Sequence, residues 1–284
     1  MDSSKGMLYL CATPIGNLDD ITLRALKVLK MVDYIAAEDT RRTIKLLNYF
    51  DIQKPLISYH EHNKQKSGEH IVELLKDGYN VALVTDAGMP GISDPGYDLN
   101  IMAYENGVST TIIPGASAGI SALVLSGLPT DRFVFEGFLS VDKKERKTRL
   151  EEIRDEKRTI ILYEAPHRLL RTLKDLKDML GNRPIAVVRE LTKVYEEVLR
   201  MDIEGTLEYF SQKPPKGEFV LVIEGAEDTK ENSFDDISIE EHIKDYISMG
   251  ISKKDAIKRV AKDRGIPKSQ VYKYGIGISD IKDK

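Results

Sequence analysis

Short apolar runs and amphipathic stretches alternate along the first 125 or so residues. Apolar runs at 8–12, 34–37, 81–84 and 110–113 predict strands. Apolar residues recur at helical spacing between the runs, which predicts helices over 21–32, 43–50, 69–76 and 97–105. Asp19 and Asp20 are the N-cap candidates for the first helix. Strands that alternate with helices predict a largely parallel, buried sheet with right-handed crossovers.

Gly and Pro interrupt this pattern at 126–131, so we place a domain boundary after residue 126. The second domain, residues 127–226, again combines strands and helices. The expected strands are 133–139, 159–163, 185–189, 198–201 and 219–223, and the expected helices are 143–156, 166–180 and 206–210. This pattern predicts a mixed sheet. The fold class is therefore α/β, with two α/β domains, the first being residues 1–126.

The charge changes sign near the C-terminus. Residues 227–245 hold eight acidic and two basic side chains, whereas 253–273 hold eight basic and two acidic ones. The pattern predicts two short helices joined by a turn at Gly265, with Pro267 or Ser269 at the start of the second. We assign residues 235–284 to a small basic helix-turn-helix-like module. A nucleic-acid contact and a merely solvated Lys-rich face are both open interpretations.

Composition narrows the function classes. The 284 residues carry 42 Lys and Arg against 46 Asp and Glu, a formal net charge of −4, which excludes a histone-like polycation. Any nucleic-acid contact must therefore be local. The single cysteine, Cys11, excludes an intramolecular disulfide and a Cys-based zinc cluster, and we expect no metal. No apolar run approaches the roughly 20 residues of a membrane-spanning helix, so we expect a cytoplasmic protein.

Three glycine-containing loops follow three of the predicted strands, at 13–17, 85–91 and 114–119. Open α/β sheets bind ligands at such strand ends. None of the loops fits the dinucleotide fingerprint or the phosphate loop, which argues against nicotinamide, flavin and ATP chemistry. Small side chains let the backbone approach a ligand closely, and this suits a purine and an amino-acid zwitterion. Alternatively, the glycines only build tight turns.

These loops belong to a set of stretches that resembles the tetrapyrrole methylase superfamily, the class III S-adenosylmethionine-dependent methyltransferases. The resemblance covers roughly residues 7–225. It rests on TPIGNLDDIT at 13–22, AEDTR at 37–41, TDAGMPGISDPG at 85–96, IPGASA at 113–118, YEAPHR at 163–168, RELTK at 189–193 and KGE at 216–218. Within the superfamily the chain resembles the branch that methylates the 2′-hydroxyl of a cytidine in the decoding region of 16S rRNA.

The resemblance implies a two-domain enzyme that holds S-adenosylmethionine in a cleft between its domains, usually as a homodimer, and acts on 16S rRNA, with the assembled 30S subunit as the expected substrate. The implied cofactor-binding residues are Pro14, Ile15, Asp86, Ala87, Gly88, Met89, Ser117, Ala118, Tyr163 and Ala165. Corrin-pathway members have a glycine-richer first loop and a Gly-Asp-Pro stretch, where this chain has Pro14 and Thr85-Asp86-Ala87. This difference favours the RNA branch.

A ribose 2′-hydroxyl is a poor nucleophile, so we expect a nearby general base. The catalytic candidates on the resembling motifs are Glu38, Asp39, Arg41, Glu164, His167, Glu190 and Lys193, and His60 is a further base candidate. The sequence does not choose among them. Asp39 or Thr40 could instead cap a helix, Pro166 could start one, and 189–193 could be an ion-paired strand edge. Cys11 is interpreted as a buried strand residue and not as a nucleophile.

Two other functions fit the same sequence. One is a small-molecule methylase that acts on a corrin precursor. The other is a cofactor-sensing RNA-binding protein without catalysis. The basic run at 143–149 is either a solvated helix face or an edge that contacts RNA phosphates.

Overall fold

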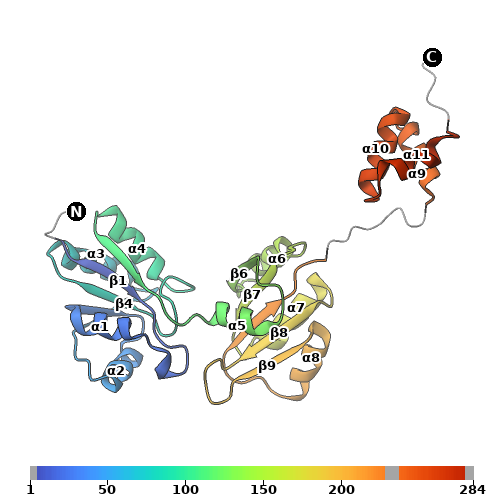
Figure 1. Ribbon diagram of the computed structural model, residues 1–284. Helices are drawn as coiled ribbons and strands as arrows, with labels where there is room; N and C mark the ends of the chain where they lie inside the picture. Colours follow the sequence, from blue (N-terminus) through green and yellow to red (C-terminus); the bar gives the residue numbers. More distant parts are fainter. Residues whose placement is uncertain (1–4, 228–236, 279–284) are drawn as a thin grey trace. The chain divides into compact units, whose positions relative to one another are not determined.

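The computed structural model describes residues 5–227 and 237–278 (Figure 1). The contacts divide the chain into two compact units, one ending at Ala226 and the other beginning at Glu227. The acidic residues at 228–236, and the ends of the predicted C-terminal module at 235–236 and 279–284, lie outside the described residues.

The first unit begins with a five-stranded parallel sheet of order β3-β2-β4-β1-β5. Its strands are β1 (Met7–Cys11), β2 (Tyr34–Ala37), β3 (Leu56–Ser58), β4 (Val81–Val84) and β5 (Ser109–Ile113). Every residue of the central strand β4 is buried, as expected for a parallel strand covered on both faces. The short strand β3 was not expected, because a run of three residues shows too little alternation to be recognised.

Helices cover both faces of this sheet. They are α1 (Leu23–Met31), α2 (Thr40–Tyr49), α3 (Lys64–Lys76) and α4 (Gly96–Glu105). Residues of α1 and α2 share one hydrophobic cluster with the strands, and residues of α3 and α4 share another. The N-cap of α1 is Thr22, whose hydroxyl accepts from the Ala25 amide at 3.0 Å, so the expectation of Asp19 or Asp20 was wrong. Those two residues instead belong to a short 3₁₀ turn, Leu18–Asp20.

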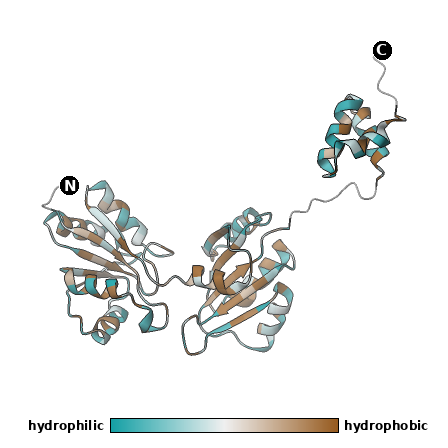
Figure 2. Cartoon of the chain, in the orientation of Figure 1, coloured by the Kyte–Doolittle hydropathy of each residue, from teal (hydrophilic) through white to brown (hydrophobic). Residues whose placement is uncertain are grey.

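The second sheet is mixed, as expected, with order β6-β7-β10-β8-β9. β6 (Phe133–Phe138) runs parallel to β7 (Thr159–Glu164), and the antiparallel strands are β8 (Pro184–Arg189), β9 (Glu197–Asp202) and β10 (Phe219–Ile223). Figure 2 shows these strands as mostly hydrophobic, whereas the helices carry both colours. The α/β fold with two sheets is therefore confirmed.

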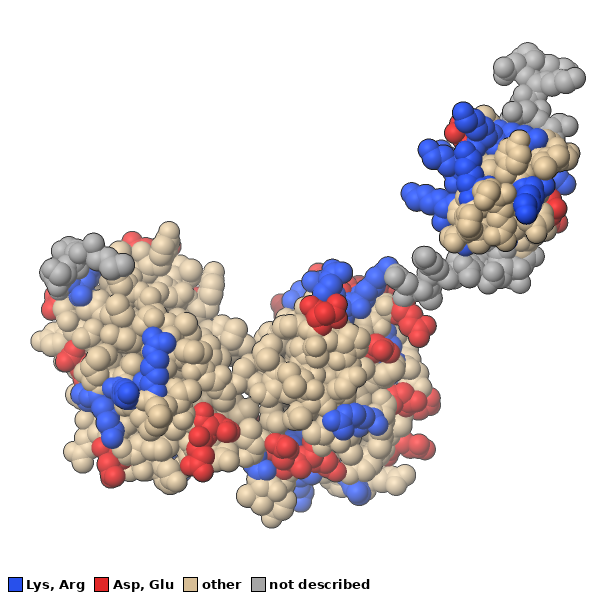
Figure 3. Space-filling model, viewed as in Figure 1, with Lys and Arg blue, Asp and Glu red and all other residues tan. Residues whose placement is uncertain are grey.

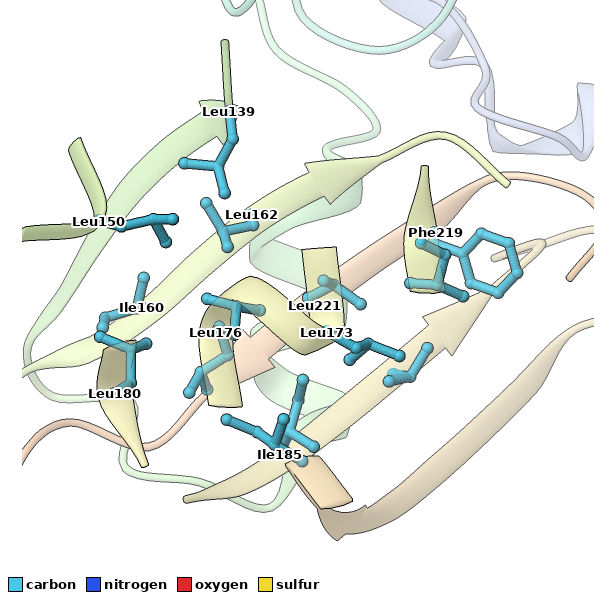
Figure 4. Close-up of a cluster of buried hydrophobic side chains, with 14 of the residues drawn as sticks. Leu139, Leu150, Ile160, Leu162, Leu173, Leu176, Leu180, Ile185, Phe219 and Leu221 are labelled. Atoms are coloured by element: carbon cyan, nitrogen blue, oxygen red, sulfur yellow. The ribbon is translucent and has the colours of Figure 1, made fainter. Parts of the chain in front are cut away.

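Three helices pack on one face of the second sheet: α6 (Lys143–Glu152), α7 (Leu169–Leu180) and α8 (Ile203–Gln212). Figure 4 shows Leu173, Leu176 and Leu180 of α7 beside strand residues such as Leu162 and Leu221. The other face is covered by α5 (Ala118–Ser126), whose Ala122 and Leu123 pack against strand residues. Thus α5, which ends at the predicted boundary, packs on the second sheet; the boundary itself stays a prediction.

Pro166 does not start α7, because the helix begins at Leu169 after a turn. That expectation was wrong. The basic run 143–149 is also not a uniform solvated face: Arg146 is buried, with its guanidinium 2.6 Å from the Asp175 carboxylate and 2.9 Å from the Thr172 hydroxyl. A buried, paired arginine is a structural residue of the second sheet's helical layer.

The second unit holds three helices in its described part, α9 (Ile239–Ser248), α10 (Lys253–Asp263) and α11 (Lys268–Gly275). The two expected helices are therefore confirmed, with Pro267 as the N-cap of α11. A small apolar cluster that includes Ile243, Ile257 and Val271 joins the three helices. In the described ranges, no helix is long and apolar enough to cross a membrane.

Candidate active site

A cavity of about 350 Å³ lies at the carboxyl ends of β2 and β4 and is closed by residues of the second sheet. This volume falls in the range of small-ligand sites. Its lining residues are Ile15, Glu38, Arg42, Thr85, Asp86, Ala87, Gly88, Met89, Ile92, Ser93, Asp94, Ser117, Ala118, Phe138, Tyr163, Glu164, Ala165, Pro166, Val188, Leu191, Glu218, Phe219 and Val220.

Nine of the ten cofactor-binding candidates line this cavity, and Pro14 does not. Its neighbour Thr13 pairs with Gly88: the Thr13 amide donates to the Gly88 carbonyl at 2.9 Å, and the Gly88 amide donates back at 3.1 Å. The first loop is thereby held against the second, and Ile15 reaches the cavity wall. Apolar walls beside several carboxylates suit a ligand with an aromatic base, hydroxyl groups and positive charge.

Glu38 lies directly after β2 and belongs to a carboxylate cluster at the cavity wall. Its Oε2 accepts from the Thr85 hydroxyl at 2.9 Å and from the Asp86 amide at 3.4 Å. Among the described residues, Oε1 of Glu38 has no hydrogen-bond partner. Asp86 accepts from the Asp39 amide at 3.1 Å and lies 3.2 Å from the Arg42 guanidinium. Burial, followed by the nearby Glu38 carboxylate, raises the pKa of Asp86.

Asp39 and Arg41 do not line the cavity. Asp39 is the N-cap of α2 and accepts from the Arg41 amide at 2.8 Å. Its carboxylate also binds the Arg41 guanidinium, at 3.1 and 2.9 Å. The hydrogen bonds from the Arg41 side chain and amide lower the pKa of Asp39 to about 2. The capping interpretation therefore describes this residue.

Glu164 lines the cavity but is buried in a polar network of its own. It accepts from the Thr172 hydroxyl and, at 2.8 Å, from the Ala165 amide, and its carboxylate lies 3.4 Å from the Arg168 guanidinium. These partners occupy both carboxylate oxygens, so Glu164 is held in place and is poorly placed to accept a substrate proton. His167 is exposed and does not line the cavity.

Glu190 and Lys193 form an ion-paired corner beside the cavity. The Lys193 ammonium lies 3.0 Å from Glu190 and 2.8 Å from Glu218, and only Glu218 of the three lines the cavity. The Glu218 amide also donates to Glu190 at 2.9 Å. Burial opposes ionisation of Glu190, but these hydrogen bonds outweigh it and lower its pKa. Residues 189–193 therefore form the ion-paired strand edge that the sequence left open as an alternative.

The same corner contacts the first loop. A Cβ at Gly16 would lie 2.6 Å from Lys193 Cγ and 2.9 Å from the Leu191 carbonyl oxygen, and the Asn17 amide donates to the Thr192 hydroxyl at 3.0 Å. Only glycine permits this close approach. Gly16 thus lets the first loop pack against the second-sheet corner next to Ile15.

Sequence reasoning gave no role to several cavity residues: Ile92, Ser93, Asp94, Phe138 and Glu218. Asp94 was quoted in a motif but not assigned a role; burial raises its pKa, although the Gly91 and Gly96 amides donate to it at 2.8 and 2.7 Å. Phe138 ends β6 beside a bulge and is half-exposed, with its ring 5.6 Å from that of Tyr163. A half-exposed aromatic ring gives no sequence signal beyond an apolar strand end. His60 does not line the cavity.

The family described as Tetrapyrrole (Corrin/Porphyrin) Methylases matches residues 7–206. The chain belongs to the tetrapyrrole methylase family. Members of this family are S-adenosylmethionine-dependent, and S-adenosylmethionine is the cofactor of this chain.

Curated relatives match most of the chain. A protein of Halalkalibacterium halodurans, named Ribosomal RNA small subunit methyltransferase I, is 51% identical over 271 residues, which cover 94% of both chains. A protein of Thermotoga maritima with the same name is 47% identical over 222 residues, which cover 78% of this chain and 100% of the relative. A solved uroporphyrin-III C-methyl transferase from Thermus thermophilus, complexed with S-adenyl homocysteine, has a TM-score of 0.55 and 17% identity, and covers 77% of this chain and 97% of its own. At that identity it shows the shared fold.

Proposed function

We propose that this protein transfers a methyl group from S-adenosylmethionine to the 2′-hydroxyl of a cytidine in the decoding region of 16S rRNA, the position usually numbered 1402. The observation that carries the proposal is the similarity, over nearly the whole chain, to proteins named Ribosomal RNA small subunit methyltransferase I. The cavity supplies a chemical rationale, because it combines apolar walls with Glu38, whose Oε1 has no hydrogen-bond partner in the described residues.

The cofactor, when bound, would supply an electrophilic methyl group on a sulfonium sulfur, with a neutral thioether as the leaving group when the carbon–sulfur bond breaks. The protein must then position the attacking oxygen, exclude water and take up its proton. The residues that would hold the cofactor are Ile15, Asp86, Ala87, Gly88, Met89, Ser117, Ala118, Tyr163 and Ala165. We keep Pro14 in this proposal as a residue that shapes the first loop.

Glu38 is the proton acceptor that the geometry favours. Thr85 and the Asp86 amide fix its Oε2, which leaves Oε1 for a substrate hydroxyl. Glu164, in contrast, is buried and fully engaged, and Asp39 is bound to Arg41. Arg41, His167, Glu190 and Lys193 are proposed to act around the site, through RNA phosphates or loop packing.

The corrin-precursor alternative is supported by the family match and by a solved tetrapyrrole methyltransferase of 17% identity, whereas relatives named Ribosomal RNA small subunit methyltransferase I reach 47–51% identity. A non-catalytic sensor would not need Glu38 to be held with one oxygen accessible. The homodimer, the assembled 30S subunit as substrate and the cytoplasmic location belong to the proposal as well. Sedimentation of the purified protein tests the first of these.

The test is methyl transfer from labelled S-adenosylmethionine to 30S subunits, naked 16S rRNA and a corrin precursor, assayed in parallel. We expect label in RNA and none in the corrin precursor. Label in the corrin precursor alone would overturn the substrate class. Cofactor binding without transfer to any of the three would favour the sensor.

A further inference from the structure

The second unit carries a basic surface that the methyl-transfer site does not use. Exposed lysines occur along α10 at Lys254, Lys258 and Lys262, one helical turn apart, and on α11 at Lys268 and Lys273. Figure 3 shows several Lys and Arg side chains projecting together from one side of this unit. Residues four apart share a face of a helix, so the three α10 lysines form a stripe.

Within the described residues these five lysines have no hydrogen-bond or ion-pair partner. The apolar side chains of the unit point inward: Ile257, Val260 and Val271 are buried. A Cβ at Gly275 would lie 2.8 Å from Ile257 Cδ1, so glycine lets α11 pack closely on α10. The lysine stripe is therefore not needed to hold the unit together.

The unit is also an addition to the methylase fold. The Thermotoga maritima relative aligns over its whole length with 78% of this chain, and the remainder is close in length to the unit from Glu227 to Lys284. The family match ends at residue 206. The Thermotoga maritima relative, a protein named Ribosomal RNA small subunit methyltransferase I, therefore has no counterpart of this size. This argues against a part for the second unit in the chemical step.

We infer that the lysine surface of Lys254, Lys258, Lys262, Lys268 and Lys273 binds rRNA phosphates and anchors the substrate, separately from the cavity where the methyl group is transferred. Partnerless lysines at helical spacing on a short helix-turn-helix-like unit are suited to a polyanionic backbone. The balanced net charge of −4 for the whole chain makes such a local surface necessary for RNA binding. This inference rests on the proposed function.

The test compares the full-length wild type with a Lys254→Gln/Lys258→Gln/Lys262→Gln variant. Binding to naked 16S rRNA is measured without cofactor over a series of salt concentrations, and steady-state methylation is measured separately. Loss of three phosphate contacts should weaken binding about ten- to fifty-fold near physiological salt and reduce the slope of log K against log salt by about 2. The KM for RNA should rise while kcat stays unchanged.

The control variant carries the same change of charge on the first unit, Lys27→Gln/Lys30→Gln/Lys45→Gln, at three exposed lysines of α1 and α2. An equal loss of affinity in this control would show a general effect of charge and overturn the inference. An unchanged salt slope in the α10 variant, or unchanged affinity for naked 16S rRNA, would overturn it too. Because binding is measured without methyl transfer, the binding result can be interpreted even if the proposed methylation is not observed.

Discussion

The Thr85 hydroxyl donates to Oε2 of Glu38 over 2.9 Å, which joins the end of β4 to the end of β2 at the cavity wall. Neighbouring strands of a parallel sheet bring these two residues together, although 47 positions separate them in the sequence. Both hydrogen bonds to this carboxylate go to Oε2, so Oε1 is the oxygen that we propose accepts the substrate proton.

Replacing Glu38 with Gln should lower kcat by about 10²- to 10⁴-fold, the usual contribution of a general base. The amide oxygen can still accept from Thr85, so the fold and the cofactor Kd should change little. Asp39→Asn is the matched control, because Asp39 is the adjacent carboxylate but does not line the cavity. Equal losses of kcat in both variants would remove Glu38 from the role.

Replacing Phe138 with Ala should weaken RNA use. The ring is 53% exposed at the cavity and offers a face on which a base can stack. Base–aromatic stacking contributes about 1–3 kcal/mol, so the KM for RNA should rise roughly 5- to 150-fold. Phe133→Ala, on the same strand but outside the cavity lining, should have little effect on this KM. A Phe138 variant with a normal KM for RNA and a weakened cofactor Kd would assign the ring to the cofactor instead.

Glu164→Ala should destabilise the protein by about 3 kcal/mol, because the buried hydrogen-bonding and ion-pair partners of the Glu164 carboxylate would be left without it. Chemical denaturation measures this free energy of unfolding. Glu151→Ala serves as the comparison, since Glu151 is exposed and makes one long ion pair of 3.7 Å with Lys147; its cost should stay within about 0.5 kcal/mol. A normal stability for Glu164→Ala would contradict the structural role given to Glu164.

Gly16→Ala should cost about 1–3 kcal/mol in overpacking and raise the cofactor Kd, because the added Cβ pushes against Lys193 and Leu191 beside Ile15. Calorimetric titration of the cofactor measures the second effect. Gly277→Ala is the control, because nothing lies within 4 Å of a Cβ there. Unchanged cofactor affinity in Gly16→Ala would show that the packing of Gly16 against Lys193 and Leu191 does not shape the cofactor cavity.

Cys11 gives a pH prediction. Burial raises the pKa of its thiol to about 12, a shift that Arg24 only partly offsets. The folded thiol therefore stays protonated, while the unfolded thiol ionises near its ordinary pKa of 9.0. Stability should then fall as pH rises from about 9 to about 12, by up to about 1.4 kcal/mol per pH unit relative to Cys11→Ala. Equal pH slopes for the two proteins, in denaturation at several pH values, would contradict the burial of this thiol.

The sequence was sufficient for the elements whose periodicity is strong. Strand β4 is apolar at every position, and α7 repeats its leucines on one face, so both were expected nearly as found. Helix caps were less predictable. Thr22 and Asp19 are both suitable N-cap residues, but Asp19 lies in the 3₁₀ turn and Thr22 caps α1.

The candidate site was predicted in part, for a physical reason. The family resemblance implied ten cofactor-binding residues, mostly in loops that follow strands, and nine of the ten line the cavity. Phe138 and Glu218 reach the cavity only because the second sheet places the ends of β6 and β10 there, and no local pattern encodes that. Likewise, Glu38 and Glu164 both look like bases until their hydrogen bonds are known.

The most direct test of the central claim is to map the methyl group on 16S rRNA after reaction of 30S subunits with S-adenosylmethionine. A 2′-O-methyl group blocks attack of the ribose hydroxyl on the neighbouring phosphate, so that one linkage resists alkaline cleavage. We expect a single resistant linkage at a cytidine in the decoding region with the wild type, and a much lower yield of it with Glu38→Gln after the same reaction time. Methylated RNA with normal alkaline sensitivity throughout would place the methyl group on a base and contradict this claim.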